Sequence, residues 1–525
     1  MTTHPDNPHP TSSQVLVALD SVFVPPSRHQ WVEMAVAGLN TGASASEEAL
    51  QQLRRHTLEG IPLDVLYDSA EVTVTLPPNS AAAGTGKTQW DNRLCANEKT
   101  SGVNLTNTRI LEALQGGITS IELHTPSAEA LAGALQNVQL DIATISLRSG
   151  TEYKRCAAAL KAIANTQGIN ESHLRCSFNA DPLGNALSAD AYHIGVNKTP
   201  IATQLDDMAH FAMAISKNTP LAHSVLVDTA IHHNAGASTV EELHAALATA
   251  TLYLEAMIDA GMNTTVAAEQ IIFQVAMDAD VLLGVAKIRT LRALWLHTLQ
   301  QFIDHTDDQT AANTIRPAFI VAETSKRYTS KLEPWNNHLR NLTASTAAFL
   351  GNTDALIVHP HDGLLRSDNN NSFDTTLGDR MARNIAIILE RESGLSNVHD
   401  PMAGAYAVEN LTRQLMQHTW QSLASTDTGE GWLDELHSGR WQTRLTHTHH
   451  QRVSLMKQEQ RIAVGINKYV QNKDTELAAT FLKKTMDEKT ADGKAAGDKS
   501  GSPMALTLVR EAEAFEQALT QEATS

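Results

Sequence analysis

The sequence predicts an α/β fold: a closed (β/α)8 TIM barrel with an extended N-terminal arm and a helical C-terminal tail. Between about residues 105 and 400, short β-branched runs alternate with longer helical patterns, which is typical of βαβ units and a parallel sheet. Seven or eight candidate strands occur in this stretch, and a helical pattern follows most of them. That number favours a closed barrel over an open sheet of five or six strands, although a doubly wound sheet stays an alternative on pattern alone.

Each candidate strand is a short run of apolar and β-branched residues. In chain order the runs are residues 118–123, 140–147, 174–178, 224–228, 271–277, 319–322 and 355–358, with an eighth near 395–398. The clearest helix covers 239–260, because Ser238 and Glu241 match a capping box at its start and Gly261 can close its end. Its apolar stripe consists of Leu243, Leu247, Ala250, Leu254 and Met257.

The segments outside the barrel differ from it in composition. The arm contains an apolar run at 15–24, a helical stretch near 45–55 and an Ala/Gly-rich connector at 77–88. The apolar face of the last predicted helix consists of Leu508, Ala512, Phe515 and Leu519. The predicted order is an N-terminal arm and connector (1–90), the barrel (91–400), a helical C-terminal extension (401–486), a flexible linker rich in Lys, Asp, Gly, Ala and Ser (487–503), and a terminal amphipathic helix (504–525).

Composition excludes several classes of protein. The 525 residues are 42% hydrophobic and 19% charged, as in ordinary globular proteins. The formal net charge of −18 repels a phosphate backbone, so neither nucleic acid nor an anionic membrane surface is expected as a partner. No apolar run is long enough for a membrane span, and the N-terminus lacks a secretory signal. The three cysteines, Cys95, Cys156 and Cys176, form no CxxC pair and predict a reducing cytoplasm, with each thiol serving as a small buried apolar group.

Two motifs suggest chemistry. Residues 84–88, GTGKT, resemble a phosphate-binding loop, but Ala81 stands where the first glycine is needed, so a flexible linker is the better interpretation. His359 and His361 follow the strand at 355–358 and point the same way in an extended segment. Together with Asp362 they form a candidate metal site of a barrel hydrolase.

A further polar segment follows the strand at 224–228, where the loops of a barrel carry catalytic groups. It is His232-His233-Asn234-Ala235-Gly236. We expect one of its two histidines to line a pocket and the other to be solvated.

Several segments in matching order and spacing, from about residue 50 to 470, carry a family resemblance. They are Glu59-Gly60-Ile61-Pro62-Leu63 with Tyr67, His233-Asn234-Ala235-Gly236-Ala237-Ser238 with Val240-Glu241-Glu242-Leu243, Val285-Ala286-Lys287-Ile288-Arg289 with Leu291-Arg292 and Leu294-Trp295, Ala322-Glu323-Thr324-Ser325 with Pro334-Trp335-Asn336-Asn337, Arg383-Asn384, Asp400-Pro401-Met402-Ala403-Gly404-Ala405-Tyr406 with Glu409 and Leu411-Thr412, and Val464-Gly465-Ile466-Asn467. Together they resemble the methylmalonyl-CoA mutase family of adenosylcobalamin-dependent mutases.

The resemblance implies an arm along the barrel, an acyl-CoA substrate lying down the barrel axis and a separate C-terminal cobalamin domain. It also implies the interconversion of methylmalonyl-CoA and succinyl-CoA, with the cofactor supplying the radical chemistry and the protein supplying burial and orientation.

Three departures from the family pattern are informative. The cobalt-ligating signature Asp-x-His-x-x-Gly does not occur after the barrel, and we expect no cobalamin-binding domain in this sequence. Catalytic members carry a histidine that touches the substrate carbonyl, and that position here is Ile231, which cannot donate a hydrogen bond. A Tyr- and Arg-rich segment that holds substrate and CoA is replaced by residues 79–89 before Trp90, so stacking and carboxylate pairing are lost.

The chain therefore resembles the small, non-catalytic subunit of the heterodimeric bacterial enzyme. This implies a large catalytic subunit as partner, with adenosylcobalamin bound there, and no cofactor, metal or catalytic residue in this chain. His233, Asn234, Asn337 and His359 are candidates for the rim of a residual pocket. The alternatives are a catalytic barrel whose cobalamin domain is on a separate chain, and the metal-dependent hydrolase that would use His359 and His361.

Overall fold

The computed structural model describes residues 26–38, 50–68, 90–97, 102–125, 127–188, 199–304, 315–366, 375–427, 431–470 and 504–522. The predictions for residues 15–24, 77–88 and 487–503 lie outside these ranges. The chain divides into two compact units, residues 1–68 and 69–525, and each is described by itself. Among the helices in the described part of the chain, none is both long enough and apolar enough to span a membrane.

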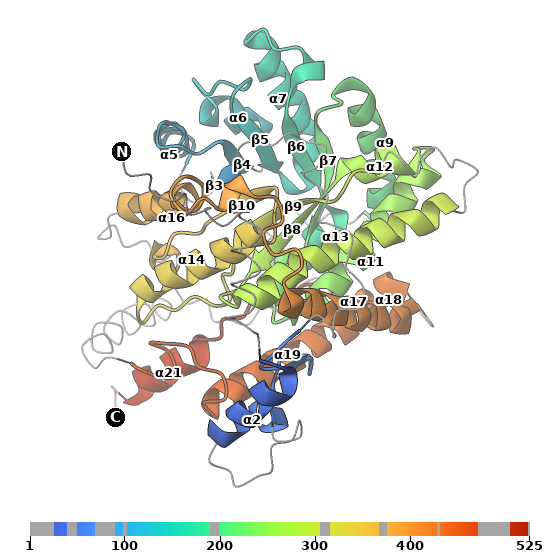
Figure 1. The fold of residues 1–525 in the computed structure, drawn as a ribbon. Helices are drawn as coiled ribbons and strands as arrows, with labels where there is room; N and C mark the ends of the chain where they lie inside the picture. Colours follow the sequence, from blue (N-terminus) through green and yellow to red (C-terminus); the bar gives the residue numbers. More distant parts are fainter. Residues whose placement is uncertain are drawn as a thin grey trace, which may run out of the picture. The chain divides into compact units, whose positions relative to one another are not determined.

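Eight parallel strands close into a barrel in residues 69–525, which confirms the predicted fold (Figure 1). Neighbours follow chain order, and the last strand closes the circle by pairing with both the first and the seventh. The strands are β3 (Asp91–Asn97), β4 (Ser120–His124), β5 (Thr144–Arg148), β6 (Cys176–Ala180), β7 (His223–Asp228), β8 (Ile271–Met277), β9 (Phe319–Thr324) and β10 (Ala355–Ile357).

Seven strands lie where the sequence predicts them, but the eighth candidate was wrong. Residues 395–397 form a 3-10 helix, η7 (Leu395–Asn397), after a left-handed Gly394. The missing strand is β3, whose sequence DNRLCAN is too polar for the strand pattern. Arg93 and Cys95 alternate along β3 and share the face that points into the barrel, and Arg93 Nε donates to Ser120 Oγ at 3.0 Å.

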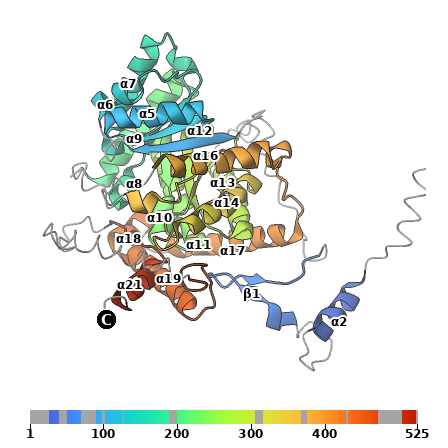
Figure 2. The same ribbon diagram turned by 90° about the vertical axis from the view of Figure 1, so that its left-hand side faces the viewer.

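Helices surround the strands, and the longest cover the side of β7, β8 and β9 (Figures 1 and 2). The predicted helix over 239–260 is α11, and its capping box is present: Ser238 accepts from the Glu241 amide, and Glu241 accepts from the Ser238 amide. The helices of the barrel are α5 (Val103–Gln115), α6 (Ala128–Ala134), α7 (Tyr153–Thr166), α8 (Pro182–Leu187), α9 (Ile201–Asn218), α10 (Ala230–Asn234), α11 (Thr239–Asp259), α12 (Thr264–Gln270), α13 (Val281–Asp304), α14 (Pro334–Leu350), α15 (Gly363–Arg366) and α16 (Thr375–Arg391).

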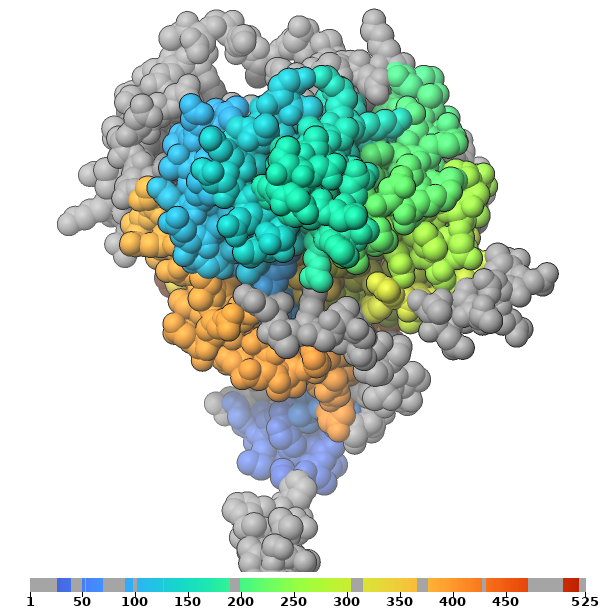
Figure 3. Space-filling view, turned by 90° about the horizontal axis from the view of Figure 1, so that it is seen from above, coloured from blue at the N-terminus to red at the C-terminus, as the bar shows by residue number. Residues whose placement is uncertain are grey.

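The ring of helices closes where α16 meets α5. Arg109 of α5 donates to Asp379 of α16 at 3.0 Å. In the space-filling view of Figure 3, an orange part of the chain lies beside the blue part.

The C-terminal extension is helical, with α17 (Tyr406–Asp427), α18 (Gly431–His437) and α19 (Arg440–Lys457). Helix α17 packs against α11 and α13, and α19 packs over α10 at the carboxyl end of β7. The terminal helix is α21 (Glu513–Glu522). Leu508 lies in the non-helical segment before α21 and is exposed, so it does not share the predicted apolar face with Ala512.

Residues of the N-terminal unit form a short helix and a hairpin. They are α2 (Arg28–Gly38), the 3-10 helix η1 (Gln51–Leu53) and the antiparallel pair β1 (Arg55–His56) and β2 (Pro62–Leu63). Ile61 is fully buried, and Arg28 donates to Asp68 at 2.7 Å. The described part of the predicted helix at 45–55 is thus mostly the turn η1 and the start of β1.

Arg289 joins the barrel to the C-terminal extension. It lies on α13, nearly fully buried, and its guanidinium donates to Asp400 and, at 2.7 Å, to Glu409 on α17. Both carboxylates are also buried, so the single guanidinium offsets negative charge from both of them away from water.

Replacing Arg289 with lysine is expected to lower the free energy of unfolding by about 1–3 kcal/mol, because one ammonium cannot hold two carboxylates at the guanidinium positions. Urea unfolding followed by circular dichroism measures this. The control is Arg155→Lys, since Arg155 pairs with Glu129 and Glu152 at the surface. Its change should stay within about 0.5 kcal/mol, and an equal loss in both variants would contradict the assigned role of Arg289.

Candidate functional site

The interior of the barrel changes from apolar to charged along the strands. An apolar layer contains Leu226, Ile272, Val321, Ala355 and Ile357, with Cys95 packed against it. At the carboxyl end, where barrel enzymes place catalytic groups, the strands instead carry Glu122, His124, Arg148, Asp228 and Glu323. This end of the barrel is the candidate site.

An ion pair links two strands at this level. Arg148 on β5 donates to Asp228 on β7, so the pair reaches over the inner face of β6, which lies between these strands. Burial raises the pKa of Asp228, which the Arg148 guanidinium counteracts. Paired charges therefore line part of the inner wall at this end of the barrel.

Glu323 on β9 gathers a second group of partners. It accepts a hydrogen bond from Gln274 at 3.2 Å and pairs with His359 Nε2 at 3.3 Å and with Lys326 Nζ at 3.9 Å. Burial would raise the pKa of Glu323, but Lys326 and His359 outweigh it and hold that pKa well below its usual range. His359 itself has a lowered pKa because of burial and the nearby Lys326.

His233 lies on α10, just after β7, and both its ring nitrogens are engaged inside the protein. Nδ1 lies 3.3 Å from Glu242 Oε2, and Nε2 lies 2.8 Å from Ser325 Oγ. Burial and Arg327 lower the pKa of His233 to about 4, so the ring is neutral at pH 7. The side chain is 4% exposed, so no ring atom is presented to solvent.

Glu242, on α11, links this helix to α13 and to β8. It accepts from Lys287 Nζ at 2.9 Å through one oxygen and from the Ala276 amide at 2.9 Å through the other. Burial would raise its pKa, but Lys287 and His233 lower it to about 2. Two of the segments that carry the family resemblance thus meet as a buried ion pair.

The prediction that one of His232 and His233 is solvated was wrong. Both are buried, because α10 is helical and turns the two rings toward different partners. His232 Nδ1 accepts from Trp441 Nε1 at 3.0 Å, and burial lowers the pKa of His232 to about 4. Ile231, on the same helix, is half-buried and packs against the main apolar core.

Residues of the C-terminal extension cover the loop after α10. Gly236 has φ of +111°, and a Cβ there would lie 2.9 Å from Leu445 O and from His449 Cβ of α19. Arg452 of α19 donates to the Gly236 carbonyl at 3.1 Å and to the Ala237 carbonyl at 3.2 Å. The loop is therefore closed off by α19 instead of facing an open pocket.

A second buried charge cluster lies beside this loop. Glu511 is fully buried, and its carboxylate lies 3.1 Å from Arg327, 3.3 Å from Arg452 and 3.6 Å from Arg461. Asp278 lies 3.3 Å from Arg327 and 3.6 Å from Arg461. Burial and repulsion by Arg327 lower the pKa of Arg452 to about 9, which reflects the excess of cations here.

The remaining predicted rim residues are held by contacts within the chain. The Asn234 side-chain oxygen accepts from the Arg327 amide at 3.1 Å, and its carbonyl accepts from the Val509 amide at 2.8 Å. Asn337 is fully buried, with its amide bonded to Ser330 and to the His361 carbonyl. Asn234 and Asn337 therefore serve as links between loops.

His359 and His361 do not form the metal site that their spacing suggested. His359 pairs with Glu323 on β9, whereas the His361 ring stacks on Trp335 of α14 with centroids 4.6 Å apart. Within the part of the chain that the structure describes, one group of three metal-capable side chains has its ligand atoms within 4.8 Å of one another, and it contains neither histidine.

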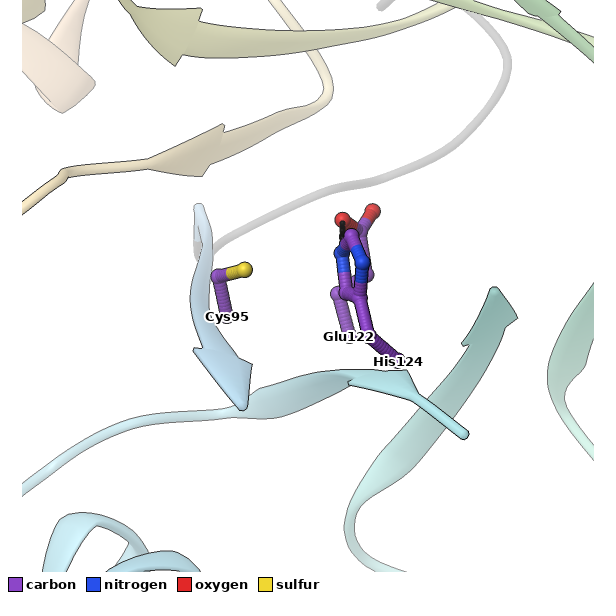
Figure 4. Close-up of side chains that lie close together, drawn as sticks. All are labelled: Cys95, Glu122 and His124. Atoms are coloured by element: carbon purple, nitrogen blue, oxygen red, sulfur yellow. Dashed lines mark hydrogen bonds and ion pairs between the residues drawn. The ribbon is translucent and has the colours of Figure 1, made fainter. Parts of the chain in front are cut away.

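That group is Cys95, Glu122 and His124, inside the barrel on β3 and β4 (Figure 4). This group is not among the sequence-based predictions, in which each cysteine is a small buried apolar group. A signal was present in Glu122-Leu123-His124, since alternate residues of a strand share a face. Its third member, Cys95, is recognised only once β3 is placed beside β4.

Comparisons with known proteins identify relatives that cover most of this chain. The family model of methylmalonyl-CoA mutase matches residues 113–521. The methylmalonyl-CoA mutase small subunit of Streptomyces virginiae is 29% identical over 472 residues, which cover 86% of this chain and 72% of that protein. The small subunit of Propionibacterium freudenreichii is 28% identical, covering 78% of this chain and 63% of that protein. The methylmalonyl-CoA mutase of Escherichia coli is 24% identical, covering 84% of this chain and 64% of that protein.

Proposed function

Because the chain belongs to the methylmalonyl-CoA mutase family, we propose that it is the small, non-catalytic subunit of an adenosylcobalamin-dependent methylmalonyl-CoA mutase. Its role is to support a large subunit that binds the cofactor and an acyl-CoA and that interconverts methylmalonyl-CoA and succinyl-CoA. The similarity of this chain to two methylmalonyl-CoA mutase small subunits supports this proposal. The three free cysteines are consistent with a cytoplasmic location.

The observation that carries the proposal is Ile231. The family resemblance puts a substrate-binding histidine at this position, and an aliphatic side chain cannot donate a hydrogen bond. Neighbouring His233 cannot replace it, because Glu242 and Ser325 occupy both its ring nitrogens. The acyl-CoA carbonyl would thus find no imidazole donor at α10.

The barrel interior also does not fit an acyl-CoA chain along its axis. The Arg148–Asp228 pair lies inside the barrel, and both side chains are mostly buried. Separating the two side chains to admit a ligand would leave two buried charges without each other as partners, and this would raise the free energy of the protein. These charges favour a barrel that acts as a scaffold.

The imidazoles on α10 and in the loop after β10 do not fit a corrinoid ligand either. His233 is bonded through both nitrogens, His359 pairs with Glu323, and His232 accepts from Trp441. Helix α19 also covers the loop after α10. We therefore derive no reaction step through adenosylcobalamin in this chain and assign the cofactor to the partner subunit.

Co-purification tests the proposal. With an affinity tag on this chain only, a co-expressed large subunit carrying Asp-x-His-x-x-Gly should be recovered in equal amount. Corrinoid absorbance should follow the large subunit and leave this chain when the two are separated. Retention of the corrinoid by this chain alone, or recovery of no large subunit, would contradict the proposal.

An Ile231→His variant separates this proposal from a catalytic barrel whose cobalamin domain is on another chain. We expect turnover of the heterodimer to change by less than about twofold, because catalysis takes place in the partner. A large gain in turnover would instead favour the catalytic barrel.

A further inference from the structure

Three side chains of different chemistry converge inside the barrel where β3 pairs with β4. Cys95 is the direct neighbour of Glu122 in the parallel register, and Asn97 is the neighbour of His124. Glu122 and His124 alternate along β4, so they share the inner face with Cys95. Figure 4 shows the sulfur pointing toward the carboxylate and the imidazole, and the three ligand atoms lie within 4.8 Å of one another.

We propose that Cys95, Glu122 and His124 bind a zinc ion. A thiolate, an imidazole and a carboxylate are all zinc ligands, and the sulfur selects against magnesium and calcium. Zinc bonds of about 2.0–2.3 Å in a tetrahedron place the ligand atoms roughly 3.3–3.8 Å apart. Glu122 and His124 are already 2.9 Å apart, so small side-chain rotations bring all three into range.

The barrel backbone fixes the relative positions of the three candidate ligands. All three residues lie in strands of the closed barrel and not in loops, so their Cα positions are fixed by the β3–β4 hydrogen bonds. Glu122 is nearly fully buried and Cys95 is half-buried, whereas the His124 side chain is 33% exposed. The exposed imidazole gives an ion a way in, and the buried carboxylate shields it once bound.

Charge around the three residues also suits a divalent cation. The nearby cations each have another anion: Arg93 pairs with Asp91 at 2.7 Å, Arg148 pairs with Asp228, and Lys326 pairs with Glu323. In the metal-bound form, in which zinc has displaced the imidazole proton, the thiolate, the carboxylate and the neutral imidazole carry two negative charges. One zinc ion neutralises both, and three protein ligands leave a fourth position for water.

Cobalt substitution tests the site with the metal alone. The purified, untagged full chain is stripped with a chelator and titrated with Co²⁺, which takes the same tetrahedral geometry and absorbs visible light. We expect one equivalent to bind, with a thiolate-to-cobalt charge-transfer band and intense d–d bands. Cys95→Ser should abolish the charge-transfer band, and His124→Ala should weaken binding by more than the ~10–100-fold typical of losing a supporting partner.

Cys156→Ala is the matched control, because Cys156 is fully buried on α7, away from the three residues. It should keep the band. Thermal unfolding separates binding from folding: Zn²⁺ should raise the Tm of the wild type and of Cys156→Ala, but not that of Cys95→Ser, whose metal-free Tm should match that of the wild type. Absence of the band in the wild type, or its survival in Cys95→Ser, would overturn the zinc site without affecting the proposed subunit role.

Discussion

Replacing Glu511 with glutamine is expected to lower the free energy of unfolding by about 3–5 kcal/mol, the range found when one partner of a buried ion pair is removed. Glu511 is fully buried and lies within 3.6 Å of Arg327, Arg452 and Arg461. Without the charge of Glu511, Asp278 would still pair with Arg327 and Arg461, whereas the buried guanidinium of Arg452 would lose its carboxylate partner. Burial and repulsion by Arg327 already lower the pKa of Arg452 to about 9. Removing the Glu511 charge would disfavour the charged form of Arg452 further.

Urea unfolding of the full chain at pH 7 measures this change. The matched control is Glu513→Gln, two residues away and exposed at the start of α21, which should change the value by less than about 0.5 kcal/mol. A loss below about 1 kcal/mol for Glu511→Gln would mean that the cluster does not hold the C-terminal segment on the barrel.

Acidification should destabilise the protein through its buried neutral histidines. Burial lowers the pKa of His232 and His233 to about 4 and that of His244 to about 3. Above pH 6.5 these rings are neutral whether the chain is folded or unfolded. Below pH 6.5, these histidines bind protons in the unfolded chain but not in the folded chain. Each histidine therefore contributes a loss of about 1.4 kcal/mol per pH unit until the pH reaches its folded pKa.

Other groups modify this slope. Asp181, whose pKa burial raises to about 6, binds its proton early in the folded state and offsets part of the loss. Glu242, with a pKa of about 2, adds to the loss below about pH 4.5. The contribution of one histidine is therefore best isolated by substitution.

His244→Gln provides that test. Its stability should be lower than that of the wild type at pH 7, but its decline between pH 6.5 and 4 should be shallower by about 1.4 kcal/mol per pH unit. The control is His210→Gln, because His210 is exposed on α9. Parallel curves for His244→Gln and the wild type would show that His244 titrates normally in the folded protein.

The barrel could be predicted from the sequence because its outward-facing strand residues are apolar and regularly spaced. Strand β3 could not be predicted in this way, because its inner face carries Arg93 and Cys95 instead of large apolar residues. The run at 395–398 misled because Leu395 packs against the core from a 3-10 turn and not from a strand. The pattern of apolar residues in a short segment indicates that the segment is buried, but it does not distinguish a strand from a packed turn.

The site was less predictable, because it depends on contacts between distant segments. Glu511 meets Arg327 and Arg452 only in the folded chain, and nothing near Glu511 in the sequence indicates a buried carboxylate. Cys95 acquires its neighbours through the β3–β4 register. In contrast, the loss of the donor at Ile231 could be recognised from the sequence, since it concerns one position within a recognised motif.

Turnover by the isolated chain tests the central claim most directly. The purified chain is supplied with adenosylcobalamin and methylmalonyl-CoA, and succinyl-CoA is measured with and without the large subunit. We expect no succinyl-CoA from this chain alone and full turnover when the large subunit is added. Succinyl-CoA formed at a comparable rate by this chain alone would contradict the assignment of a supporting, non-catalytic subunit.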